Sequence, residues 1–123
     1  MCKVELNLII GTIMRIAFID FIDWAYSPET PYQGPLGGIQ SAVCYLSESL
    51  AHNGHKVFLI NNHPQMEMVR GVFVIPLNMD QEILKNILTK IEVDALVVIG
   101  SSSAGPQLKP LLASSTKLVF WTG

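Results

Sequence analysis

The sequence predicts an α/β fold, in which a mostly parallel sheet of about five strands carries helices on both faces. Half of the 123 residues are hydrophobic and only 15% are charged, well below the usual proportion of about a quarter. Short apolar runs rich in Val, Ile and Phe alternate with longer segments whose apolar residues recur with the period of a helix. Strands that alternate with helices in this way form parallel sheets through right-handed crossovers.

The first strand is predicted at Arg15–Asp20 (RIAFID), a short apolar run of the kind that is buried on both faces of a sheet. The following residues, Phe21–Leu36, include three prolines and Gly34, a composition that opposes both a helix and a central strand. We therefore expect a long loop at the carboxyl end of the first strand. Ordered loops of this length are commonly functional.

A helix is predicted from Gly38 to about Asn53. Its apolar residues have the spacing of one helical face, and they are Ile39, Ala42, Val43, Leu46 and Leu50. Asn53 and Gly54 end the helix, because glycine readily takes the left-handed conformation that follows a last turn. The run Lys56–Ile60 then predicts a second buried strand, so that these elements form a βαβ unit.

The rest of the chain continues the alternation. A second helix is predicted to begin at Asp80, a typical N-cap residue, and its apolar stripe ends at Ile91. The other predicted elements are strands at Gly71–Leu77, Asp94–Ile99 and Lys117–Trp121, a turn at Gly100–Gly105 and a short helix at Pro106–Ala113. The order βαββαβαβ predicts a Rossmann-like sheet.

The length and the start of the chain bear on its domain organisation. A chain of 123 residues buries one core, and we expect one partial domain over residues 14–123, preceded by an extension over residues 1–13. The natural start is either Met1 or Met14, because a strand-like run follows the second of these. The apolar run Leu6–Ile13 is interrupted by a polar residue and lacks a cleavage site, so we do not interpret it as a secretory signal.

Composition argues against several classes of protein. Eight Lys and Arg against ten Asp and Glu give a formal charge of −2 without a basic cluster, so nucleic acid is not an expected partner. No run reaches the roughly eighteen apolar residues of a membrane span. Cys2 and Cys44 form no C-x-x-C pair, which argues against a zinc site and fits a cytoplasmic location. His55 is expected to hydrogen-bond at a turn rather than to bind a metal.

The sharpest local feature is Gly37-Gly38 at the start of a predicted helix, directly after the loop that leaves the first strand. Residues without a Cβ let another group approach the backbone, and a helix N-terminus presents unpaired N–H groups and a partial positive charge. The pair also fits a simple tight turn. The position favours an anionic ligand, since ligands of open α/β sheets bind at the carboxyl ends of the strands near the switch point.

Other nucleotide and catalytic motifs are absent or incomplete. G-x-G-x-x-G is missing, and Gly100 and Gly105 have the glycine spacing of a phosphate loop, but Pro106 stands where lysine is required. The sequence GSSSA after a strand resembles a nucleophile elbow around Ser102, which keeps a serine hydrolase as a third hypothesis. All three histidines precede that serine, whereas the hydrolase fold brings its histidine afterwards, so hydroxyls that bond local backbone groups explain the serines better.

The long loop carries several candidate ligands of its own. Trp24, Tyr26 and Tyr32 place aromatic rings where a sugar or a lipid could stack, although the same rings could cover the edge of the core. Asp20 and Asp23 could bind hydroxyls or act as a base, or they could cap the loop. The sequence leaves these alternatives open.

Taken together, MRIAFID, the proline-rich loop, GPLGGIQSAVCYLSESLAHNGHKVFLI and KLVFWTG resemble the N-terminal domain of retaining glycosyltransferases of the GT-B fold, the family that includes phosphatidylinositol mannosyltransferases. The resemblance covers Met14–Gly123. Its most specific part is a helix that opens with GGIQS and closes with GHKV.

The resemblance implies transfer of a sugar from a nucleotide-sugar donor to a glycan, lipid or small-molecule acceptor, without a metal or another cofactor. In that arrangement Gly37 and Gly38 approach the donor diphosphate. The residues that face the acceptor are Gln40, Asp23, Trp24 and Tyr32. A peripheral contact of the full protein with a membrane is compatible with this family.

The chain also departs from the complete family. It stops at Gly123, before the histidine that follows the strand resembling Lys117–Trp121, and it contains no Glu-x7-Glu motif. We therefore expect the chain alone to be inactive and to self-associate through the sheet edge at its last strand. A self-contained nucleotide-binding or flavodoxin-like module is the alternative, followed by the serine hydrolase.

Overall fold

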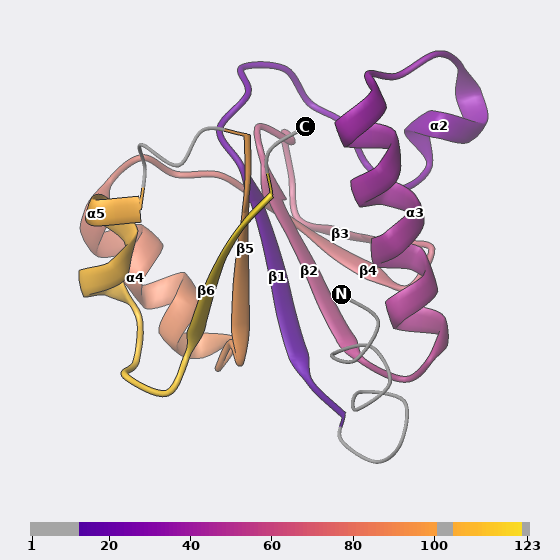
Figure 1. The fold of residues 1–123 in the computed structure, drawn as a ribbon. Helices are drawn as coiled ribbons and strands as arrows, with labels where there is room; N and C mark the ends of the chain where they lie inside the picture. Colours follow the sequence, from indigo (N-terminus) through magenta and orange to yellow (C-terminus); the bar gives the residue numbers. More distant parts are fainter. Residues whose placement is uncertain (1–12, 101–104, 122–123) are drawn as a thin grey trace.

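The computed structural model of the chain describes residues 13–100 and 105–121. Over these residues one sheet of six strands is covered by helices on both faces (Figure 1). The strands are β1 (Arg15–Asp20), β2 (Lys56–Asn61), β3 (Glu67–Val69), β4 (Val72–Pro76), β5 (Ala95–Ile99) and β6 (Lys117–Trp121). The helices are α2 (Thr30–Gln33), α3 (Gly38–His52), α4 (Gln81–Lys90), α5 (Gly105–Leu108) and the 3₁₀ turn η2 (Lys109–Leu111).

The strand order is β3-β4-β2-β1-β5-β6, and every neighbouring pair is parallel except β3 with β4. Without β3, the order along the sheet is third, second, first, fourth and fifth strand. This is the Rossmann-like order, which differs from the flavodoxin-like order. The direction of winding reverses beside β1, so the carboxyl ends of β1 and β5 border the switch point where such sheets bind ligands.

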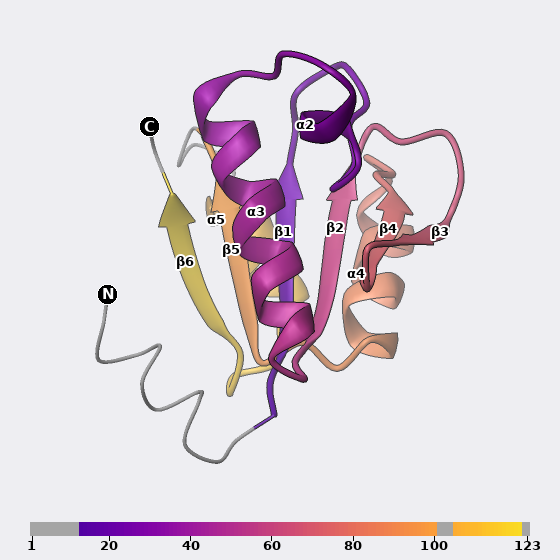
Figure 2. The same cartoon turned by 90° about the vertical axis from the view of Figure 1, so that its right-hand side faces the viewer.

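Successive side chains of the central strands point into two apolar layers. Figure 2 shows α3 crossing one face of the sheet, with α4 and α5 on the other. The layer under α3 contains Ile16, Phe18, Tyr26, Val43, Cys44, Val57, Leu59, Val72 and Ile99. The layer under α4 and α5 contains Ala17, Ile19, Phe58, Ile60, Ile75, Leu84, Leu88, Val93, Leu96, Val98 and Leu108. The prediction of helices on both faces is confirmed.

Two short elements were not predicted. The strand β3 pairs antiparallel with β4 and adds a sixth strand to the expected five. The turn between them has positive φ at both Arg70 (49°) and Gly71 (82°), as a tight hairpin requires. The predicted loop Phe21–Leu36 contains the single turn α2, whose proline lies at the helix start, where a missing N–H breaks no helical bond.

The other predicted boundaries hold closely. Asn53 caps the end of α3, and Gly54 has the expected left-handed φ of 94°. The Asp80 side chain accepts hydrogen bonds from the backbone N–H groups of Glu82 and Ile83, so its predicted role as an N-cap is confirmed. The last predicted helix is shorter than expected, because α5 gives way to η2.

Some predictions lie outside the described residues, including most of the extension over residues 1–13 and the serines of the turn Gly100–Gly105. None of the helices in the described ranges is long and apolar enough to cross a membrane.

Candidate functional site

A buried polar cluster lies at the carboxyl ends of the central strands. Asp20 is the last residue of β1 and is 4% exposed, whereas Asn61 is the last residue of β2 and is fully buried. Strand alternation directs both side chains to the face covered by α3. The strands therefore bring two polar groups under the start of that helix.

Asp20 holds the loop and the helix to the end of β1. Its Oδ2 atom accepts a 2.7 Å hydrogen bond from the Tyr26 hydroxyl and a 3.2 Å bond from Nε2 of Gln40. Its Oδ1 atom accepts from the backbone N–H of Ile22 at 3.1 Å. Burial, and then the bond to Asp20, raise the pKa of Tyr26 far above its ordinary value, so the phenol remains a donor. These contacts favour a structural role for Asp20 over that of a base.

The loop is also anchored to β2 and α3. Asn61 Nδ2 donates a 2.7 Å hydrogen bond to the backbone oxygen of Tyr26, and the Cys44 thiol donates to the backbone oxygen of Ser27 at 3.4 Å. Burial raises the pKa of Cys44 to about 12, which keeps the sulfur a thiol and makes it a poor nucleophile. The buried Oδ1 atom of Asn61 finds no hydrogen-bond partner among the residues that the structure describes.

The N-terminus of α3 is exposed and lacks a side-chain cap. Gly37 occupies the N-cap position, and over residues 13–100 and 105–121 the structure shows no side-chain cap hydrogen bond at this end of the helix. The start of α4 differs, because there the Asp80 carboxylate fills this role. The first turn of α3 therefore keeps its N–H groups and partial positive charge available to an external anion.

The two glycines at this terminus have different surroundings. A Cβ on Gly37 would lie 2.8 Å from Oε1 of Gln40, whereas a Cβ on Gly38 would meet no atom of the described residues within 4 Å. The absence of a side chain at Gly37 thus makes room for Gln40, a contact within the chain. Only at Gly38 does the missing side chain leave open space through which a ligand can approach the helix.

The structure separates the four predicted acceptor residues into two groups. Gln40 is buried against Asp20, which also anchors the chain segment that carries the exposed residues Asp23 and Trp24. The backbone oxygen of Asp23 accepts a 2.9 Å bond from Asn62 Nδ2. Trp24 is 39% exposed, and its ring centroid lies 5.5 Å from that of Tyr26.

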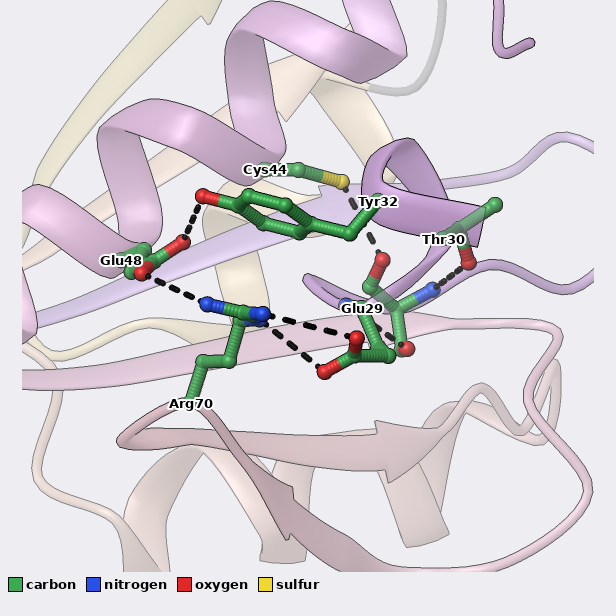
Figure 3. Close-up of polar contacts among 7 residues, drawn as sticks. Glu29, Thr30, Tyr32, Cys44, Glu48 and Arg70 are labelled. Atoms are coloured by element: carbon green, nitrogen blue, oxygen red, sulfur yellow. Dashed lines mark hydrogen bonds and ion pairs between the residues drawn. The ribbon is translucent and has the colours of Figure 1, made fainter. Parts of the chain in front are cut away.

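Tyr32 belongs to a different set of contacts. Its hydroxyl donates a 2.8 Å hydrogen bond to Glu48 of α3, and the guanidinium of Arg70 lies over its ring (Figure 3). Arg70 also pairs with Glu29. Sequence reasoning did not find this arrangement, because its members lie up to 41 residues apart and carry no motif.

Neither a metal site nor a hydrolase site emerges from the described residues. Residues 13–100 and 105–121 contain no group of three His, Cys, Asp or Glu side chains that could hold a metal ion. His55 is buried, and its Nδ1 atom accepts a 3.0 Å bond from the backbone N–H of Met14, which confirms its predicted role at a turn. Ser102 lies outside the described residues.

A hollow of about 320 Å³ lies at the amino ends of β5 and β6. The N-terminus of α3 lies at the other end of the strands, where their carboxyl ends are. The residues that line it include the acidic residues Glu92 and Asp94. Negative charges there oppose the binding of an anion such as a diphosphate. We therefore assign the candidate anion site to the start of α3 and not to the hollow.

Comparison of the chain with protein-family models, curated proteins and solved structures gave no match.

Proposed function

We propose that the chain forms the acceptor-side part of a GT-B glycosyltransferase, which transfers a sugar from a nucleotide-sugar donor to an acceptor with retention. The observation that carries the proposal is the exposed, uncapped N-terminus of α3 with open space at Gly38. It follows the loop from β1, and the strand order puts the end of β1 at the switch point. A ligand with a diphosphate group suits this position.

Departure of a nucleoside diphosphate develops negative charge on its phosphate oxygens. Fixed backbone N–H groups and the positive end of a helix stabilise this charge without a metal ion. In α3 the first turn is held in place by the bond between Gln40 and Asp20. We therefore infer that Gln40 positions these N–H groups, which is a supporting role and not a contact with the acceptor.

The acceptor is assigned to the exposed part of the loop beside this terminus. Trp24 offers a partly exposed ring for stacking on a sugar, and Asp23 offers an exposed carboxylate for its hydroxyls. The hydroxyl and ring of Tyr32 are engaged by Glu48 and Arg70, so we assign Tyr32 to support of the loop. The buried free thiol of Cys44 agrees with the cytoplasmic location that we propose.

Calorimetry with UDP-sugars and GDP-sugars tests the proposal. Backbone N–H groups contact only the diphosphate, and base and ribose would be held by a second domain. The chain should therefore bind either donor weakly, with a dissociation constant on the order of millimolar. Micromolar affinity would contradict the half-site and favour a self-contained nucleotide-binding module.

A further inference from the structure

Arg70 joins the turn between β3 and β4 to two residues that lie 41 and 22 positions earlier in the sequence, Glu29 and Glu48 (Figure 3). From the turn between β3 and β4, its Nε atom donates a 3.0 Å bond to Oε1 of Glu29, next to α2. Its Nη1 atom donates to Oε2 of Glu48 on α3 at 3.3 Å. Its guanidinium carbon lies 3.6 Å from the centroid of the Tyr32 ring. We call Glu29, Tyr32, Glu48 and Arg70 the Arg70 cluster.

The element that this cluster holds has little stability of its own. The helix α2 has four residues and contributes no buried residue to the core. Isolated helices of this length do not form in water, because nucleation costs more than a single turn returns. The order of α2 must therefore come from tertiary contacts, and the Arg70 cluster supplies contacts at Glu29 and Tyr32.

The loop has a second, buried anchor. Tyr26 and Ser27 are bonded to Asp20, Asn61 and Cys44 inside the molecule. The Arg70 cluster is instead exposed, so its ion pairs are weakened by salt, whereas the buried bonds are not. The two anchors therefore differ in how easily they open.

We propose that Arg70 acts as a latch, meaning a set of exposed contacts that can open, for α2 and residues 34–37 of the loop. It holds α2 in place and, through residues 34–37 that lead directly into α3, it fixes the approach to the uncapped helix N-terminus. When the latch opens, α2 and these residues lose their order while the sheet and the buried anchor stay folded. The inference concerns loop order and holds whichever ligand binds at α3.

Charge and geometry make Arg70 the essential member. One guanidinium lies between the carboxylates of Glu29 and Glu48, so its removal leaves two negative groups facing the same space. Each exposed ion pair, and each exposed cation–π contact, changes the ratio of open to closed α2 by a factor of about two to five. Loss of the combined contacts should raise the open population of α2 about tenfold.

Amide hydrogen exchange measured by NMR tests the latch in the chain as it is. The N–H groups of Tyr32 and Gly34 are suitable reporters, because they bond the backbone oxygens of Glu29 and Thr30. Arg70→Gln should accelerate their exchange about tenfold and leave the amides of β1 and β2 unchanged. The matched control, Lys85→Gln, removes one positive charge from an exposed position on α4, across the sheet, and should change neither group.

Two further measurements guard against a variant that fails to fold. In the unmodified chain, raising salt from about 0.05 M to about 1 M should accelerate the same two amides, because the Debye length falls from more than 10 Å to about 3 Å. Glu29→Gln should also accelerate exchange of these two amides. In the Arg70→Gln background it should cause no further acceleration, because no guanidinium is left for Glu29 to pair with. Unchanged exchange in α2, or equal acceleration throughout the sheet, would overturn the proposal.

Discussion

Gly37 and Gly38 are adjacent glycines, yet the space that their missing side chains leave differs in the structure. The side chain of Gln40 folds back over Gly37 and is itself held by Asp20. From the sequence, the pair predicted close approach by a ligand, and the tight turn was its alternative. The contact with Gln40 depends on the position of Asp20 at the end of a strand, and glycine spacing carries no information about it.

Gly37→Ala should lower the free energy of unfolding by about 0.5 to 1.5 kcal/mol, the worth of one hydrogen bond. The new Cβ would displace the Gln40 oxygen, and because that side chain is tied to Asp20, the displacement weakens the bond at Nε2. Urea denaturation measures the change.

Two control variants separate this contact from a general effect of alanine. Gly38→Ala should leave stability unchanged or slightly higher, since its Cβ meets nothing within 4 Å. Gly37→Ala should cost less in the Gln40→Ala background, where only the N-cap preference for glycine over alanine remains. Equal losses from Gly37→Ala in both backgrounds would show that Gln40 is not the cause.

At the scale of elements, the bounds of helices and strands could be predicted from the sequence where burial imposes a periodic pattern of apolar residues. The bounds of β1, whose last five residues are buried, agree with the prediction, and α3 ends one residue early. The bounds of β6 agree as well, although this strand is mostly exposed. In contrast, β3 and α2 are short and mostly exposed, so they carry no apolar periodicity. Their order comes from contacts with β4 and with the Arg70 cluster, which no local pattern reveals.

The turn between β3 and β4 gives a prediction for one such element. Gly71→Ala should cost about 1 to 2 kcal/mol, because the residue has a φ of 82°. The added Cβ would also lie 3.2 Å from that of Ala51 on α3. Thermal unfolding should show the loss.

Gly34→Ala is the matched control for the turn. Its φ of 174° is extended backbone, and a Cβ there meets nothing within 4 Å. This variant should unfold at nearly the temperature of the unmodified chain. A loss at Gly34 as large as that at Gly71 would rule out the left-handed turn as the cause.

At the scale of the whole molecule, the two edges of the sheet differ. The edge strand β3 has three residues and pairs antiparallel. The other edge strand, β6, has five residues and exposes Val119 (45%) and Phe120 (41%). Within the described residues no strand pairs with the outer side of β6, so we expect copies of the chain to associate there.

Sedimentation of the unmodified chain and of Val119→Lys tests the role of this edge. The unmodified chain should form dimers or larger species at high micromolar concentration, and the lysine should shift the population towards monomer, because charge opposes edge-to-edge pairing. Lys85→Gln again serves as a surface control. Monomers of the unmodified chain at that concentration would contradict the expectation.

The most direct test of the proposed function follows the backbone amides of α3 by NMR during titration with a UDP-sugar, a GDP-sugar and inorganic pyrophosphate. All three ligands should shift the signals of Gly38, Ile39 and Gln40 with millimolar affinity. Gly38→Val should keep the fold and lose these shifts, since its branched side chain fills the open space at the helix start. Shifts that spare α3, that gather around Glu92 and Asp94, or that persist in Gly38→Val would contradict the diphosphate site.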